Sequence, residues 1–158
     1  MDNRENSNKI LDAMIQNEER MGSLYRLGAE RFPSHRDLWS SLAEEERQHA
    51  DWIRKLRERL SDGSSRFDVS AFDPALMDQS LQKTAALAKL LENTTIRVED
   101  VLAAAKDLEE SLLESKYFEI FTNDTAEIKQ VKYCLAEATR EHFERLADAV
   151  TQCSGPGR

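Results

Sequence analysis

The sequence predicts an all-α protein that folds as a single domain over residues 1–158. Apolar residues recur at steps of three and four along most of the chain, which is the period of an amphipathic helix. Only 5 glycines and 3 prolines are present, too few for the turns that a many-stranded β-fold requires. Apolar residues make up 40% of the chain, and in this periodic arrangement they suffice for a buried core.

The first two long helices are expected at about residues 7–31 and 35–60. The first should end before Pro33, because proline cannot continue a helix and restrains the residue before it. Ser34 is expected to be the N-cap of the second helix, and Asp37, three residues on, the acid of a capping box. These two helices are thus joined by a short link.

A shorter amphipathic helix is expected at about residues 74–92, after the longest irregular stretch of the chain. Two more long helices follow at about 98–121 and 125–153, again with a short link between them. Residues 154–158 form a loose tail rich in glycine and proline.

The lengths of the connections predict how the four long helices are arranged. A short link makes its two helices antiparallel neighbours, whereas the long middle connection, with its own short helix, can cross the length of a bundle. This is the ferritin-like topology, a four-helix bundle with one long crossover. The alternative is a plain up-down-up-down bundle with a decorated loop.

The charge balance excludes some classes of partner. The chain has 30 acidic and 22 basic residues and a formal net charge of −8, which argues against nucleic acid and anionic membranes as general partners. No apolar run is as long as a membrane span, and the first residues lack the apolar stretch of a signal peptide.

The two cysteines, Cys134 and Cys153, are expected to be reduced thiols in a cytoplasmic protein. We also expect a homodimer, because helices this long offer broad, flat faces.

The sequence indicates a two-helix unit that occurs twice in the chain. Residues 42–49 (LAEEERQH) and 135–142 (LAEATREH) share Leu, Ala, Glu, Arg and His at a constant separation of 93 positions. A fainter match, at a separation of 91 positions, relates the first helix to the fourth. The repeat draws attention to the histidine that ends each of the two matching segments.

Several polar residues fall on the apolar stripes of the long helices. In the second helix, Glu46 and His49 lie between Leu42 and Ile53 at steps of three and four, which places them on the core face. In the fourth helix, the phase of the stripe favours Glu109 and leaves Glu110 as the alternative. The residues selected in this way are Glu18, Glu46, His49, Glu109 and His142. His35, by contrast, is expected at the surface.

Carboxylates and imidazoles are costly to bury unless they are paired or bound to a metal. If carboxylates from several helices converge at one level, they repel each other, and a divalent or trivalent cation removes that repulsion. Oxygen and imidazole donors suit iron, manganese or zinc better than the metals that require thiolates. The alternative is a solvated or hydrogen-bonded pair, because a Glu three residues before a His is common in a chain this acidic.

These residues resemble the ligands of the ferritin-like di-iron carboxylate proteins, and Leu-Ala-x-x-Glu-x-x-His at residues 42–49 is most similar to rubrerythrin. The resemblance covers roughly residues 8–150. It implies a non-haem centre of two irons that reacts with peroxide or O2. In that centre Glu18 and Glu109 would be terminal ligands, Glu46 a bridging ligand, and His49 and His142 imidazole ligands. It also implies that Tyr25 or Tyr117 donates a hydrogen bond to a ligand.

The sequence departs from rubrerythrin in two places. Thr139 occupies the position where the second Glu-x-x-His should have its glutamate, so one bridging carboxylate is missing and the centre is reduced to one metal or binds the second weakly. The chain also lacks the two Cys-x-x-Cys motifs of a rubredoxin domain. Any electrons would therefore come from an external donor protein.

Three functions follow from this pattern. The first is a rubrerythrin-like oxidoreductase that reduces peroxide. The second is a metal-binding or iron-handling module without turnover. The third is a metal-free helical scaffold that binds a partner.

Overall fold

The computed structural model describes residues 3–61, 73–114 and 126–155. Within these ranges the protein has five α-helices, one short 3-10 turn and no strand, so the predicted all-α class is confirmed. The elements in chain order are α1 (Asn3–Arg31), η1 (Pro33–His35), α2 (Arg36–Ser61), α3 (Pro74–Glu92), α4 (Val98–Glu114) and α5 (Ala126–Cys153).

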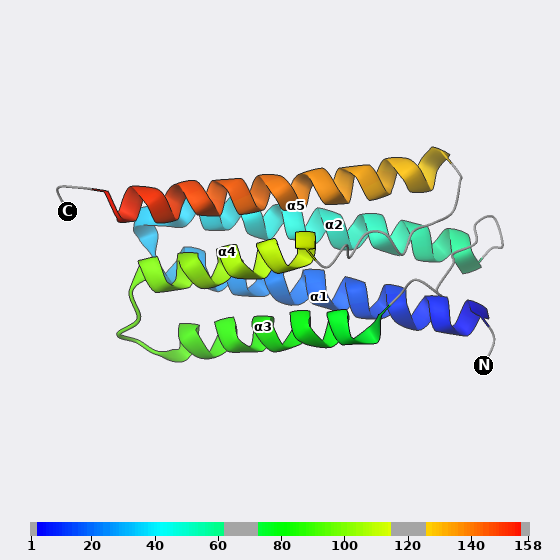
Figure 1. Cartoon of the computed structure of the whole chain (residues 1–158), viewed down its shortest axis with the longest axis horizontal. Coiled ribbons are helices and arrows are strands. Elements are labelled where there is room, and N and C mark those ends of the chain that lie inside the picture. Colours follow the sequence, from blue (N-terminus) through cyan, green and yellow to red (C-terminus); the bar gives the residue numbers. More distant parts are fainter. Residues whose placement is uncertain (1–2, 62–72, 115–125, 156–158) are drawn as a thin grey trace.

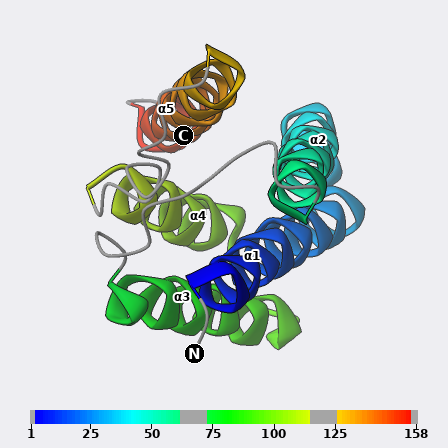
Figure 2. The same ribbon diagram turned by 90° about the vertical axis from the view of Figure 1, so that its right-hand side faces the viewer.

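The five helices run lengthwise beside one another (Figure 1). Helix α1 packs against α2 and helix α4 packs against α5, and each pair is antiparallel. Helices α2 and α4 run in the same direction. Helix α3 packs against α1 and α4, and it runs parallel to α1 and antiparallel to α4. The end view shows α3 on one side of the molecule, beneath α1 and α4, with α2 and α5 above them (Figure 2).

The start of α2 differs from the sequence prediction. The Pro33–His35 segment forms a 3-10 turn in which the His35 amide donates to the Phe32 carbonyl, N···O 3.0 Å, and α2 begins at Arg36. Ser34 lies inside this turn, and its hydroxyl contacts His35 Nδ1 at 2.9 Å. The predicted capping box of Ser34 and Asp37 is therefore wrong, because the fixed φ of Pro33 starts a tight turn before the α-helix begins.

The other helix limits are close to those expected. Helix α1 begins at Asn3 rather than at residue 7. Its first turns are polar, so apolar periodicity does not predict them, and an exposed Glu5–Lys9 ion pair at 3.0 Å stabilises the helix there. The expected ranges 74–92 and 125–153 match α3 and α5 to within one residue. The segment 115–121 of the fourth predicted helix lies outside the described residues, as do Tyr117 and residues 156–158.

Helices α1 and α2 approach closely where α1 has a glycine. A Cβ atom at Gly28 would lie only 2.9 Å from Cδ2 of Trp39. The Trp39 ring is fully buried, and its centroid lies 5.7 Å from that of the Tyr25 ring. This packing fixes the register of α1 against α2, and with it the height at which Tyr25 enters the core.

Helix α3 is a docked part of the fold. Asp73 caps its N-terminus by accepting from the Ala75 amide at 3.0 Å, and Pro74 occupies the first turn. The buried Ser80 hydroxyl donates to Asn17 Oδ1 of α1 at 3.1 Å. Near the other end, Arg31 of α1 donates to the carbonyl of Asn93 at 3.0 Å. These bonds join α3 to α1 in the first half of α3 and at its C-terminal end.

The core is mainly Leu, Ile, Met and Ala, and one level of it is polar. None of the described helices has a stretch long and apolar enough to cross a bilayer. The buried polar side chains at the polar level are Glu18, Glu46, His49, Glu109, Thr139 and His142.

Candidate metal centre

The five side chains selected from the sequence converge in the structure, although they come from four helices. Glu18 lies on α1, Glu46 and His49 on α2, Glu109 on α4 and His142 on α5. Each is at most 3% exposed. An amphipathic helix buries whatever occupies its inner stripe, so the helical periodicity that forms the core also delivers these polar groups to one place.

The carboxylate of Glu46 lies between the two imidazoles. Its Oε2 is 3.1 Å from Nδ1 of His49, and its Oε1 is 3.1 Å from Nδ1 of His142. The two rings stack with centroids 5.2 Å apart and an interplanar angle of 21°. One donor atom from each of the three residues falls within 4.8 Å of the others, so a single metal ion can contact all three.

Two further carboxylates flank this group. Oε2 of Glu18 lies 3.6 Å from Nδ1 of His49, and Oε1 of Glu109 lies 3.4 Å from Nδ1 of His142. The arrangement is therefore roughly symmetric, with one Glu and one His on each side of Glu46. Glu110 is half-exposed and lines an open cleft between α3 and α4, so Glu109 and not Glu110 enters the cluster.

One oxygen in the cluster has no partner. The Tyr25 hydroxyl donates to Oε1 of Glu109 at 2.6 Å, but Oε2 of Glu109 is buried without a hydrogen-bond partner among the described residues. A buried carboxylate oxygen left in this state costs free energy. A metal ion would supply the missing contact, so the residues present fit a cation.

His142 is held in place from its other side. Its Nε2 lies 2.6 Å from Oε2 of Glu45, and Arg145 donates to the same oxygen at 2.7 Å. An N–H group on Nε2 that donates to Glu45 leaves the lone pair of Nδ1 directed at the cluster, which is the tautomer a metal requires. On the other side, the Trp52 ring lies 5.4 Å from the ring of His49.

Sequence reasoning missed Glu45. The resemblance implies that Tyr25 or Tyr117 donates a hydrogen bond to a ligand; the structure shows the Tyr25 hydroxyl bonded to Glu109, and Tyr117 lies outside the described residues. Glu45 keeps about a third of its side chain exposed, 37%, because it reaches across the edge of α2 to α5. Its position just before Glu46 placed it off the apolar stripe. The only sequence signal is that Arg145 lies three residues after His142, one helical turn along the same face.

Thr139 lies at the level of the cluster and is buried. Its hydroxyl donates to the carbonyl of Leu135 in its own helix at 2.8 Å. A Ser or Thr inside a helix commonly satisfies itself in this way. The position that would supply a fourth inward carboxylate in a symmetric site is thus filled by a neutral group that is bonded to its own backbone.

The electrostatics of the two histidines reflect the surrounding acids. Burial lowers the pKa of His142, but its hydrogen bonds with Glu109, Glu45 and Glu46 outweigh burial and raise the pKa to about 12. Burial likewise opposes the hydrogen bonds of His49 with Glu18 and Glu46, which raise its pKa to about 10. Without metal, both imidazoles therefore hold two protons at neutral pH.

The carboxyl groups divide into two kinds. Burial and the charge of Glu46 raise the pKa of Glu18 well above its ordinary value, and the same two causes raise that of Glu109. Burial also acts to raise the pKa of Glu46, but hydrogen bonds from Glu18 and both histidines lower it well below the usual range. In the metal-free protein, the surroundings thus favour the ionised form of Glu46 at the centre and the protonated forms of Glu18 and Glu109 beside it.

A cation and protons are thus alternative ways to neutralise the same cluster. When ionised, the three buried carboxylates, Glu18, Glu46 and Glu109, balance one divalent cation with a single negative charge left over. One retained proton then makes the site neutral. Two divalent cations would leave a single positive charge in the core, which is unfavourable. Glu45 does not change this balance, because Arg145 neutralises it.

The remaining titratable candidates lie elsewhere. His35 is half-buried at the turn between α1 and α2 rather than fully at the surface, and its Nε2 is 3.8 Å from Sγ of Cys153. Cys134 accepts a hydrogen bond from Gln130 at 3.3 Å. Both cysteines are free thiols, as expected, and neither belongs to the cluster.

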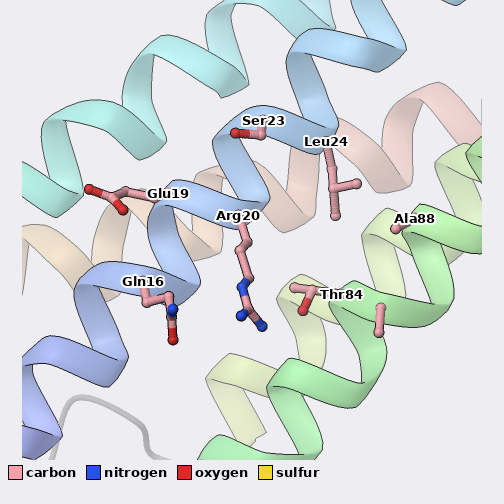
Figure 3. Close-up of a pocket in the computed structure, with 8 residues that line it drawn as sticks. Gln16, Glu19, Arg20, Ser23, Leu24, Thr84 and Ala88 are labelled. Carbon is pink, nitrogen blue, oxygen red and sulfur yellow. The ribbon is translucent and has the colours of Figure 1, made fainter.

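A large cleft elsewhere on the protein is also separate from the cluster. It has a volume of about 550 Å³ and lies between α1 and α3. Arg20 points from α1 across this cleft towards Thr84 of α3 (Figure 3). Apart from the buried Thr84, its polar side chains are exposed, and none of the five cluster residues lines it. Size alone therefore does not make it the functional site.

Comparisons of the chain with protein-family models, with curated proteins and with solved structures give no match. The functional argument therefore depends on the geometry and chemistry of the cluster.

Proposed function

We propose that this protein is a ferritin-like helical metal protein that holds a divalent cation between α1, α2, α4 and α5. The antiparallel pairs and the parallel course of α2 and α4 support a four-helix bundle in which α3 belongs to the long crossover. The observation that carries the proposal is the Glu46 carboxylate, which lies 3.1 Å from Nδ1 of both His49 and His142 deep in the core.

The site holds one ion in preference to two. Glu46, His49 and His142 are its central ligands, and Glu18 and Glu109 complete the set from either side. One divalent ion with one retained proton leaves the core neutral, and Thr139 provides no charge for a second ion. Carboxylate and imidazole donors suit Fe²⁺, Mn²⁺ or Zn²⁺.

Iron at this site would provide redox chemistry with peroxide or O2, which is the activity that the resemblance to rubrerythrin implies. The residues around it have distinct tasks. Tyr25 holds Glu109 through its hydroxyl, and Glu45 fixes the tautomer of His142. Turnover would need an external electron donor, because the chain has no Cys-x-x-Cys motif.

A second candidate, a metal-free scaffold, is favoured by a different observation. Both nitrogens of His142 and Nδ1 of His49 lie within 3.1 Å of a carboxylate oxygen. Protons alone can therefore satisfy those three nitrogens as a buried network of ion pairs. In that case, the cluster would specify how the helices pack and would bind no metal.

The two candidates are separated by metal analysis and thermal unfolding. The purified protein is stripped with a chelator and then titrated with Fe²⁺ under nitrogen, with Mn²⁺ and with Zn²⁺. The metal protein should retain close to one ion per chain and unfold at a higher temperature, because a ligand that binds only the folded state stabilises it. A scaffold should retain none and show no shift.

A further inference from the structure

Polar side chains between α2 and α5 connect the metal centre with solvent. Tyr25 and Glu45 lie outside the five cluster residues and form hydrogen bonds with them. Tyr25 is fully buried, whereas the side chain of Glu45 is 37% exposed. Since each of the five cluster residues is at most 3% exposed, Glu45 is the point at which this bonded network meets water.

A single imidazole ring separates Glu45 from the central carboxylate of the cluster. Nε2 of His142 lies 2.6 Å from Oε2 of Glu45, and Nδ1 of the same ring lies 3.1 Å from Oε1 of Glu46. Opening the Glu45–His142 hydrogen bond would therefore let a cation pass along the edge of this ring, from the exposed carboxylate to the buried one.

Arg145 covers Glu45 in the structure. Its guanidinium donates to Oε2 of Glu45 at 2.7 Å and also to the Ser41 hydroxyl. The charge of Glu45 is then neutralised, so Glu45 attracts a cation only weakly. The side chain of Arg145 is itself 33% exposed, and it lines a cleft of about 470 Å³ between the start of α2 and the end of α5. The guanidinium therefore has room to leave Glu45.

The same cleft offers Arg145 a second acidic partner. Asp148 is exposed, lines the cleft and follows Arg145 by three residues on α5, a separation at which side chains on a helix reach each other. If Arg145 turns from Glu45 to Asp148, it exchanges one partly exposed ion pair for another. Because such pairs differ little in strength, the two positions of the arginine are close in free energy.

We propose that the polar contact zone between α2 and α5 is the entry site for the divalent cation, and that Arg145 is its latch. In the closed position Arg145 neutralises Glu45. When Arg145 turns to Asp148, the freed Glu45 carboxylate receives the cation from solvent and passes it along the ring of His142 to Glu46. The inference rests on the proposed metal site, but it concerns the rate of binding, whereas that proposal concerns whether the ion is held.

The first test measures how fast Co²⁺ binds to chelated protein, by stopped-flow tryptophan fluorescence, because the Trp52 ring lies 5.4 Å from the ring of His49. Arg145→Gln uncovers Glu45 and should speed association by roughly fivefold or more, the factor expected from one exposed charge at contact distance in water. Arg140→Gln is the matched control. It removes the same charge from an exposed arginine of α5 that pairs with Glu137, and it should leave the rate close to that of the wild type.

Two further variants separate a latch from a general loosening of the contact between α2 and α5. In Arg145→Gln/Glu45→Gln the carboxylate is absent, so association should fall to the wild-type rate or below it. Asp148→Asn removes the second partner of the arginine and should slow association, whereas Glu144→Gln, an equal change at an exposed position of α5, should not. A double variant as fast as Arg145→Gln would overturn the role of Glu45, and equal rates in Asp148→Asn and Glu144→Gln would overturn the exchange of partners.

Metal content at equilibrium is measured on each protein before the kinetics. A wild type that holds no Co²⁺ would refute the metal site itself, and with it any entry route. A wild type that holds close to one Co²⁺ per chain, with equal association rates in Arg145→Gln and Arg140→Gln, would refute the entry site between α2 and α5 and leave the metal site standing.

Discussion

Replacing Glu46 with glutamine separates a metal ligand from a structural ion pair. The substitution keeps the size of the side chain and removes its charge, while the partners on both sides remain in place. Glu46 is 1% exposed and lies 3.1 Å from each imidazole Nδ1. The change therefore acts on the most central interaction of the cluster.

Two magnitudes are expected for this variant. Without metal, removing one partner of a buried ion pair costs about 3–5 kcal/mol of unfolding free energy, or roughly 6–20 °C in Tm for a protein of this size. With metal at 100 times the Kd, the wild type gains about 2.7 kcal/mol, or roughly 5–11 °C. The Glu46→Gln protein should therefore unfold at a lower temperature than the wild type without metal, and its Tm should not rise when metal is added.

The assay is thermal unfolding followed by circular dichroism, with chelator or with each metal, at one protein concentration. Glu44→Gln is the matched control, because Glu44 is exposed and pairs with Arg47 at the surface. It should unfold as the wild type does under both conditions. If Glu46→Gln kept the full metal-dependent rise in Tm, Glu46 would not be a ligand, and the cluster would have to be a structural network.

Three further predictions address the missing carboxylate, the helix packing and the titration of the cluster. Thr139→Glu should raise metal content from about one ion per chain towards two, since a fourth carboxylate makes two divalent ions neutral; unchanged metal content in a folded variant would contradict this charge argument. Gly28→Ala should lower the unfolding free energy in urea by about 1–3 kcal/mol through overpacking, because the new Cβ would lie 2.9 Å from the buried ring of Trp39; a gain of about 1 kcal/mol would mean that helix propensity outweighs the clash. The pKa values of His49 and His142 are raised to about 10 and 12 in the folded protein, whereas a histidine in the unfolded chain has a pKa near 6.5. The stability that these two protonated histidines contribute is therefore complete below the unfolded pKa and is lost as the pH rises through 10 to 12. Chelated protein should therefore lose stability between pH 7 and 10, and apparent metal affinity should rise over the same range as bound protons are released; a metal affinity that does not change with pH would contradict this titration.

The sequence predicts the fold class and most helix limits well, because both depend on a period that can be counted. The same period places Glu18, Glu46, His49 and His142 on inner faces, and the structure brings them together. Their role as metal ligands stays a prediction. The choice between Glu109 and Glu110 depends on the structure. Consecutive residues on a helix are about 100° apart around its axis, and the apolar stripe of α4 is wide.

Two features could not be read from the sequence, for physical reasons. Glu45 reaches His142 from a half-exposed position, a contact that depends on how α2 and α5 cross and not on the pattern of either helix. Before α2, the sequence predicts Ser34 as an N-cap, but the chain forms a 3-10 turn that starts at Pro33 and includes Ser34. In both cases the outcome depends on geometry between elements, which local patterns do not specify.

The central claim is that a metal ion binds between Glu46, His49 and His142, and anomalous diffraction tests it most directly. Crystals grown with Fe²⁺, Mn²⁺ or Zn²⁺ are measured on both sides of the absorption edge of the metal. The account predicts one anomalous peak within bonding distance of the Glu46 carboxylate and of Nδ1 of both histidines. Crystals that contain the metal in solution but show no peak at this position, with the three side chains still in mutual contact, would contradict it.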